Sequence, residues 1–248
     1  MPDFLIKTSG TWINVATVLV GTGCGLLLRH RLPQAMQTII TQAVGLLTLF
    51  IGVSMAASLA QANAGPIDGI ILGLLALVLG GLLGEWWAIE AKLTALGDRL
   101  KRQFRGGGKF TEGFVAASLL FCVGPLTLIG SLNNGLSGDD TLLTLKAAMD
   151  GLAAIALTGS YGIGVGFSAL VILLFQGGVS LLASTLSQLI GDPASDPGIA
   201  LATGAGGIMI LGLGLNLLQV GKIRVASFLP ALVLAPIIYA IAQWLVNF

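Results

Sequence analysis

A few polar residues interrupt otherwise apolar stretches of this 248-residue chain, and these are the candidates for chemistry. Lys146 and Asp150 are four residues apart, so on a helix they would share one face and could form an ion pair. They follow a polar loop, one or two turns into an apolar segment. Two interpretations stay equally open: a functional pair that lines the outer part of a solute path, or a structural salt bridge with Lys146 reaching to the outer interface.

Three further polar side chains lie in apolar segments: Asn14, Gln176 and Asn216. Each alone is typical of a hydrogen bond between neighbouring helices. Together with Lys146 and Asp150 they are consistent with a polar path through the molecule. Glu85 is expected at a membrane boundary, as a cap or as a partner for the cations near Arg99.

Catalytic motifs are hard to find. The one histidine, His30, lies in a basic turn, where a buried Ser–His pair is not expected. The sequence holds no His-Glu-x-x-His motif and no Cys/His cluster suited to zinc. Asp150 has no second aspartate facing it on another apolar segment. We therefore predict no enzyme activity, no metal and no cofactor.

The composition indicates an integral membrane protein. The mean hydropathy is +0.96, with 55% hydrophobic and 9% charged residues, against about 25% charged residues in soluble domains. High hydrophobicity excludes intrinsic disorder, and a net charge of +1 disfavours nucleic-acid binding. Cys24 and Cys122 both lie in apolar runs, which argues against a disulfide scaffold. The expected partner is the lipid bilayer.

Apolar stretches long enough to cross a bilayer predict an all-α polytopic transmembrane bundle of about seven or eight spans. The region 141–190 holds either two crossings or a broken, partly re-entrant arrangement. We predict one membrane domain, 1–248, with a first half at 9–87, a connector at 88–109 and a second half at 110–248. The expected spans lie near 10–28, 35–60, 67–87, 113–130, 141–159, 161–189, 199–218 and 226–246.

Basic residues favour alternate loops: ten of the 12 fall on one predicted side, for eight crossings or for six with a re-entrant pair. The positive-inside rule then makes the basic loops cytoplasmic and puts both termini outside. Asp139 and Asp192 lie in acidic loops on the outer side. The connector 88–109 predicts an amphipathic helix at the cytoplasmic interface, either as a plain linker or as a lipid-sensing element. Its apolar positions are Ile89, Leu93, Leu96, Leu100 and Phe104.

The 36 glycines predict close helix packing. Pairs four residues apart are the expected contact points: Gly21 and Gly25, Gly80 and Gly84, Gly162 and Gly166. The glycines also suggest an internal repeat. The run Gly21–Gly25 resembles Gly162–Gly166, and the pair Gly45 and Gly52 resembles Gly207 and Gly214. If the first span corresponds to the sixth, the two units are inverted in the membrane, as in many transporters.

The segment 110–139 carries a more specific signal, with Glu-Gly-Phe at 112–114 and Cys-Val-Gly-Pro at 122–125. It resembles the hallmark of the YqgA/YdfK-like bacterial inner-membrane family, domain of unknown function 554. Leu126 stands where Met is expected, and Asn134 where an acidic residue is frequent. Supporting stretches cover nearly the whole chain: Arg31-Leu-Pro33, Gly84-Glu85, Lys146 with Asp150-Gly151, Gly162–Gly166, Gln176-Gly177 and Leu229–Leu232.

The resemblance implies a bacterial plasma-membrane protein and supplies no catalytic or ligand residues. Our leading hypothesis is transport or permeation of a small solute or ion. The alternative is a structural or regulatory membrane protein without a substrate path, and a homo-oligomer stays open. The two hypotheses differ in one respect: transport predicts polar residues that converge at the middle of the membrane, whereas a scaffold predicts a dry, glycine-packed bundle.

Overall fold

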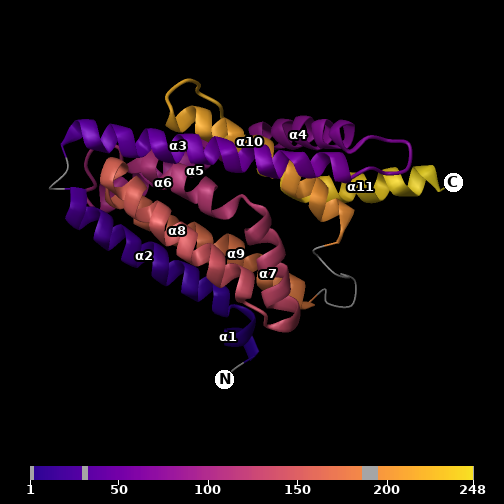
Figure 1. Ribbon diagram of the computed structural model, residues 1–248, viewed down its shortest axis with the longest axis horizontal. Helices are drawn as coiled ribbons and strands as arrows, with labels where there is room; N and C mark the ends of the chain where they lie inside the picture. The colour runs from indigo at the N-terminus through magenta and orange to yellow at the C-terminus, as the bar shows by residue number, and fades with distance from the viewer. Residues whose placement is uncertain (1–2, 30–32, 186–194, 248) are drawn as a thin grey trace.

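The computed structural model describes residues 3–29, 33–185 and 195–247, and within these ranges every named element is a helix (Figure 1). Three of the elements are short 3-10 turns: η1 (Ala57–Gln61), η2 (Ile163–Phe167) and η3 (Val225–Phe228). The α-helices are α1 (Asp3–Lys7), α2 (Ser9–Arg29), α3 (Gln34–Ala56), α4 (Gly69–Trp86), α5 (Ile89–Gln103), α6 (Phe110–Cys122), α7 (Pro125–Ser137), α8 (Thr141–Tyr161), α9 (Ser168–Thr185), α10 (Pro197–Leu217) and α11 (Ala231–Val246).

Among the described residues, seven stretches are long and apolar enough to cross a membrane, and the bent pair α6–α7 makes an eighth if it counts as one span. This confirms the predicted all-α polytopic bundle. The region 141–190 holds two separate helices, α8 and α9, and its last residues, 186–190, lie outside the described residues. The break falls instead in the fourth span, where α6 and α7 differ in direction by 60°. That span was predicted to end near 130, but its helix continues to Ser137.

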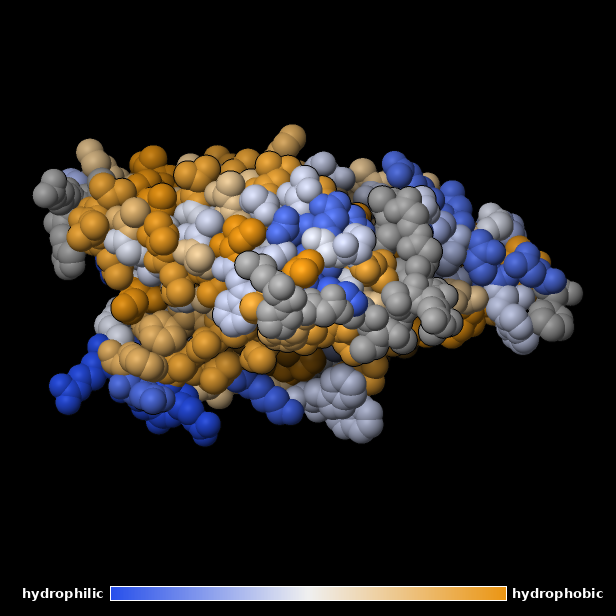
Figure 2. Space-filling model, turned by 90° about the horizontal axis from the view of Figure 1, so that it is seen from below, coloured by the Kyte–Doolittle hydropathy of each residue, from blue (hydrophilic) through white to orange (hydrophobic). Residues whose placement is uncertain are grey.

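The outer surface suits lipid. Large apolar side chains project from several spanning helices, among them Phe50 (71% exposed), Leu152 (69%) and Leu174 (75%). Figure 2 shows one face on which hydrophobic side chains cover broad areas, with hydrophilic side chains in a group near its middle and along its margins. Exposed apolar area of this extent would be a liability in water. In a bilayer it needs no further cover.

Glycines let the helices touch at the backbone. A Cβ atom on Gly21 would collide with the carbonyl oxygen of Gly151, so α2 and α8 are in backbone contact. Gly52 of α3 faces Gly207 of α10 in the same way, and Gly84 of α4 faces Ser227. Figure 1 shows α3 running beside α10, and α2 beside α8. Close approach replaces the hydrophobic driving force that lipid does not supply.

The contacts also give the helix directions. Gly45 meets Leu218 while Gly214 meets Leu49, so α3 and α10 are antiparallel. Gly10 meets Leu143 while Gly25 meets Thr158, so α2 and α8 are parallel. Since the short link η2 turns the chain back after α8, α9 runs opposite to both.

Only one of the two glycine matches proposed for the internal repeat relates equivalent positions in the helices. Gly162 and Gly166 lie in the link between α8 and α9, not in α9, so their resemblance to the run Gly21–Gly25 within α2 does not relate equivalent positions. The second glycine match does hold together. One separation of 162 residues relates three pairs in antiparallel helices: Gly45 with Gly207, Gly52 with Gly214, and Asn14 with Gln176. This regularity fits two inverted units, α2–α4 and α9–α11, and the inverted repeat stays a prediction.

The connector does contain an amphipathic helix, α5, which begins after Ala88 in a left-handed conformation (φ 52°). Part of its apolar face packs on protein: Leu100 is buried with Phe110 and Phe114 of α6. Leu96 and Phe104 stay largely exposed, although the Phe104 ring also packs on that of Phe167 in η2. α5 therefore docks on the bundle as well as presenting cations to its surroundings.

Apart from Lys146 and Asp150 of α8, the described charges gather at the two ends of the bundle. We call one end the basic end, because α2, α5 and α10 all finish there and it carries Arg29, Lys109, Lys222 and Arg224. The opposite, acidic end holds the starts of α4, α8 and α10, each preceded by an aspartate: Asp68, Asp140 and Asp196.

Candidate functional site

Helix α8 buries an ion pair near its centre. Lys146 and Asp150 lie one turn apart on one face, and the Lys146 ammonium contacts Oδ2 of Asp150. The two residues are only 6% and 8% exposed, and Asp150 is close to the middle of a 21-residue helix. In the described part of the chain, no other charged residue lies so far from the ends of a spanning helix. Lys146 points inward to its partner, so the interpretation as an interfacial salt bridge does not fit this structure.

Two amides and a hydroxyl extend the pair into a network across three helices. The side-chain amide of Asn14 in α2 donates to Asp150 Oδ2 (2.9 Å) and to Gln176 Oε1 in α9 (3.0 Å). Gln176 Nε2 in turn donates to the Thr11 hydroxyl (3.4 Å). Asn14, Gln176 and Thr11 are fully buried. We call Thr11, Asn14, Lys146, Asp150 and Gln176 the central polar cluster.

The broken helix lies beside this cluster. α6 ends at Cys122, Val123 and Gly124 are extended, and α7 begins at Pro125, which has no amide hydrogen to continue the helix. The Thr127 hydroxyl covers one freed carbonyl by donating to Phe121 O (3.2 Å). Cys122 belongs to the same buried cluster as Ala154, which lies one turn from Asp150 in α8. Irregular backbone at this depth is tolerated only inside protein or along a cavity.

Hydrogen bonds close the structure above the cluster, at the acidic end. Asn134 of α7 accepts from the Gly10 amide (3.2 Å) and donates to Ile6 O (3.1 Å). The Ser9 hydroxyl donates to Asp140 Oδ2 (2.5 Å). These bonds tie the start of α2 to the end of α7 and the start of α8.

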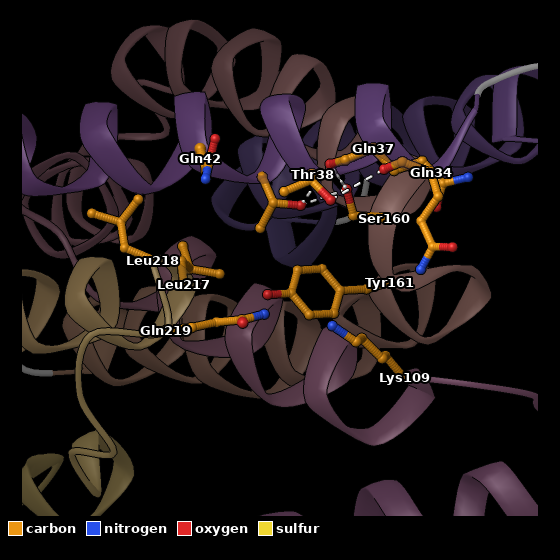
Figure 3. A pocket seen from close by; sticks show the side chains of 11 residues that line it. Gln34, Gln37, Thr38, Gln42, Lys109, Ser160, Tyr161, Leu217, Leu218 and Gln219 are labelled. Carbon is orange, nitrogen blue, oxygen red and sulfur yellow. Dashed lines mark hydrogen bonds between the residues drawn. The ribbon is translucent and has the colours of Figure 1, made fainter.

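The basic end is open by contrast. A groove of about 900 Å³ lies between α5, α6, α10 and the segment 219–225. A second cavity of about 160 Å³ adjoins it against α3. Figure 3 shows this second cavity, in which the Tyr161 ring lies between Lys109 and Gln219. The Lys109 ammonium is 5.9 Å from the centre of that ring, and both residues line the groove as well. We call these two spaces, which share Lys109 and Tyr161 in their walls, the vestibule.

Carboxylates at the basic end hold the segment that follows α10. Glu85 pairs with Arg224 (2.6 Å) in an exposed bridge, so the expected partnership with the cations near Arg99 is wrong. Glu90 accepts from the Ala226 amide (2.7 Å). Burial of its carboxyl group raises the pKa of Glu90 above the ordinary value of 4.5, against the opposing influence of that hydrogen bond and of Arg224.

The structure unites four of the five polar residues named from the sequence. Asn14, Lys146, Asp150 and Gln176 meet in the central polar cluster. Asn216 does not join them: its side chain holds the Ile223 backbone through two hydrogen bonds (2.7 and 2.8 Å) at the rim of the vestibule. Thr11 was missed, although its position three residues before Asn14 placed both on one helix face. Three residues used in the sequence analysis lie outside the described residues: His30, Arg31 and Asp192.

Comparisons with known proteins agree with the resemblance noted in the sequence. The chain is 29% identical over 229 residues to "Uncharacterized membrane protein YdfK" of Bacillus subtilis (strain 168), covering 92% of this chain and 94% of the relative. It is 29% identical over 242 residues to "Uncharacterized protein YqgA" of Escherichia coli (strain K12), covering 95% and 98%. No solved structure matches. The model of the family "Protein of unknown function (DUF554)" matches residues 9–240, and the chain therefore belongs to that family.

Proposed function

We propose that this protein transports or conducts a small solute or ion across the bacterial plasma membrane, with its basic end in the cytoplasm. The observation that carries the proposal is the central polar cluster, in which a Lys–Asp pair is buried near the middle of a spanning helix. Charges at such depth are costly and are typical of solute or ion pathways. The bias of basic residues toward one end supports the orientation.

Two further features support transport over a purely structural role. The broken helix α6–α7 lies beside the cluster, and discontinuous helices commonly form substrate sites in transporters. The vestibule opens the basic end, while hydrogen bonds close the acidic end, which suits one state of an alternating-access cycle. A scaffold would explain the glycine contacts, but it gains nothing from a buried ion pair that apolar residues could replace without loss of stability.

The test uses the purified full-length protein in liposomes loaded with unlabelled solutes. Exchange of labelled inorganic cations, inorganic anions, amino acids and carboxylates is measured, one class at a time. Three proteins are compared: wild type, Asp150→Asn, and Asp139→Asn as the matched control, because Asp139 is exposed at the acidic end.

We expect at least one class to exchange through wild type and Asp139→Asn, and this exchange to be lost in a folded Asp150→Asn. Transport is contradicted if no class exchanges. A folded Asp150→Asn that exchanges solute at the wild-type rate would refute the assignment of the central polar cluster to the path.

A further inference from the structure

A second set of buried polar groups lies between the central polar cluster and the vestibule. The hydroxyls of Thr22, Ser118 and Thr158 are buried and have no hydrogen-bond partner among the described residues. Other hydroxyls on the same kinds of helix bond to a carbonyl one turn back, as Thr48 does to Val44 O (2.7 Å). The three unpartnered hydroxyls therefore need another partner, and buried water is the usual one.

Helical spacing aligns two of these hydroxyls with the cluster. In α8, Asp150, Ala154 and Thr158 recur every four residues, all buried on one face. In α2, Asn14 and Thr22 are eight residues apart on the face that meets α8. Since α2 and α8 are parallel and Asn14 bonds to Asp150, the two threonines lie at a similar level below the cluster.

The third hydroxyl bridges the interval. Ser118 lies one turn before Cys122 in α6, on the side of Cys122 that faces the basic end, and Cys122 shares a buried cluster with Ala154 of α8. From Asp150 to Thr158 the helix rises about 12 Å. Ser118 lies within that interval, because Gly113, five residues earlier in α6, meets Tyr161 of α8 and α6 runs opposite to α8.

The three unpartnered hydroxyls lead to the vestibule. Tyr161 is less than one turn beyond Thr158 in α8 and lines both of its spaces. On α2, the Thr22 side chain contacts Gly166 of η2, the short turn that follows α8. Polar groups thus lead from the basic end to Asp150. Toward the opposite end, hydrogen bonds join Asn134, Ser9 and Asp140, although the buried hydroxyls of Ser131 and Ser180 also have no partner among the described residues.

We propose that Thr158, Thr22 and Ser118 hold a file of water that carries protons between the vestibule and Asp150, which makes Asp150 the proton-coupling site of the transporter. The step balances: hydronium gives a proton to the Asp150 carboxylate, water and a carboxylic acid result, and Lys146 is released from its ion pair. This inference rests on the proposed transport function, whose coupling ion it names.

Few other titratable groups lie near Asp150 among the described residues. The helices packed on α8 at this level bring Asn14 and Gln176, which do not titrate, and Cys122, which does. The described residues of α3 and α7 carry no charged side chain. Asp150 and Lys146, with the Cys122 thiol beside them, are the groups that can take part.

Cysteine accessibility tests the water file without any transported solute. Thr22, Ser118 and Thr158 are changed one at a time to Cys in a Cys24→Ser, Cys122→Ala background. Membrane vesicles of either orientation are treated with Ag⁺, and thiols left unreacted are counted with a fluorescent maleimide after denaturation. Leu157→Cys is the matched control, because Leu157 adjoins Thr158 and is buried among apolar side chains.

We expect all three cysteines to react from the basic end and Leu157→Cys to stay protected. Reaction no faster than that of Leu157→Cys, or reaction only from the acidic end, would overturn the proposed path. Serine and threonine are close to cysteine in size, so these variants keep the packing.

Infrared spectroscopy of the purified wild type tests the proton itself. We expect a protonated-carboxyl band whose intensity changes with pH and which is absent in Asp150→Asn. In the double variant Thr158→Val, Ser118→Ala, we expect the proton of this group to exchange with deuterium severalfold more slowly than in wild type. A band that survives Asp150→Asn, or an unchanged exchange rate, would overturn the proposal. Either of these results would refute the water file but not the transport function, which the solute exchange in liposomes tests separately. If no solute exchanged while the three cysteines still reacted from the basic end, the transport function would be refuted and the hydrated path would remain.

Discussion

Breaking the Lys146–Asp150 pair one partner at a time should destabilise the protein more than removing both. Asp150→Asn leaves the Lys146 ammonium buried, only 7% of its side chain being exposed, beside a neutral amide. Lys146→Met leaves the Asp150 carboxylate with the Asn14 amide as its remaining donor. Stranding one charge of a buried pair costs about 3–5 kcal/mol. The double variant buries no charge, and its asparagine can still bond to Asn14.

The assay is a double-mutant cycle on thermal unfolding in detergent. At roughly 2–4 °C per kcal/mol for a chain of this size, each single variant should melt some 6–20 °C below wild type, using the 3–5 kcal/mol cost of a stranded charge. The double variant should recover part of that loss, with a coupling of about 2–3 kcal/mol, the upper range for residues in contact.

The exposed pair of Glu85 and Arg224 is the internal control. Its side chains are 51% and 67% exposed, so its cycle should give about 0–1 kcal/mol. If the Lys146–Asp150 cycle gave the same small coupling, with all variants close to wild type, the pair would not be desolvated and the reasoning about its burial would be wrong.

Three other expectations concern separate parts of the chain. Gly162→Leu should lower the melting temperature by the equivalent of about 1–3 kcal/mol, because Gly162 has φ 84° and ψ −160°, a region nearly restricted to glycine. Gly107 has open space around it, so Gly107→Leu should melt like wild type, and equal melting temperatures of the two variants would contradict the argument. Reporter fusions after Arg105 should signal cytoplasm and fusions after Asp139 the outside; a cytoplasmic signal after Asp139 would reverse the orientation. The pKa of Glu90 is higher in the folded protein than in the unfolded chain, so its protonation adds stability that is complete below pH 4.5 and is lost as pH rises through the raised pKa. The melting temperature of wild type should therefore fall over this pH window, and that of Glu90→Gln should change less. Identical pH profiles of the two proteins would refute the assignment.

The sequence by itself determined the class of fold and most span boundaries. Apolar runs of about 20 residues admit one economical backbone in lipid, so α2, α3, α4, α8, α10 and α11 begin and end within a few residues of the predicted spans. The i, i+4 spacing of Lys146 and Asp150 also determined that they could pair, because a helix places such residues on one face.

Only the tertiary structure decided which helices face one another. More than 20 residues separate each of Asn14, Asp150 and Gln176 from the next along the chain. They meet because glycines allow α2 to touch α8 at the backbone. Asn216 is as polar as Asn14, but its helix ends beside a loop whose backbone takes up its amide. The sequence placed a possible break in 141–190, whereas the structure has it at the Gly-Pro step between α6 and α7. Spacing along a helix is a local property, whereas burial and partnership depend on packing between segments far apart in the chain.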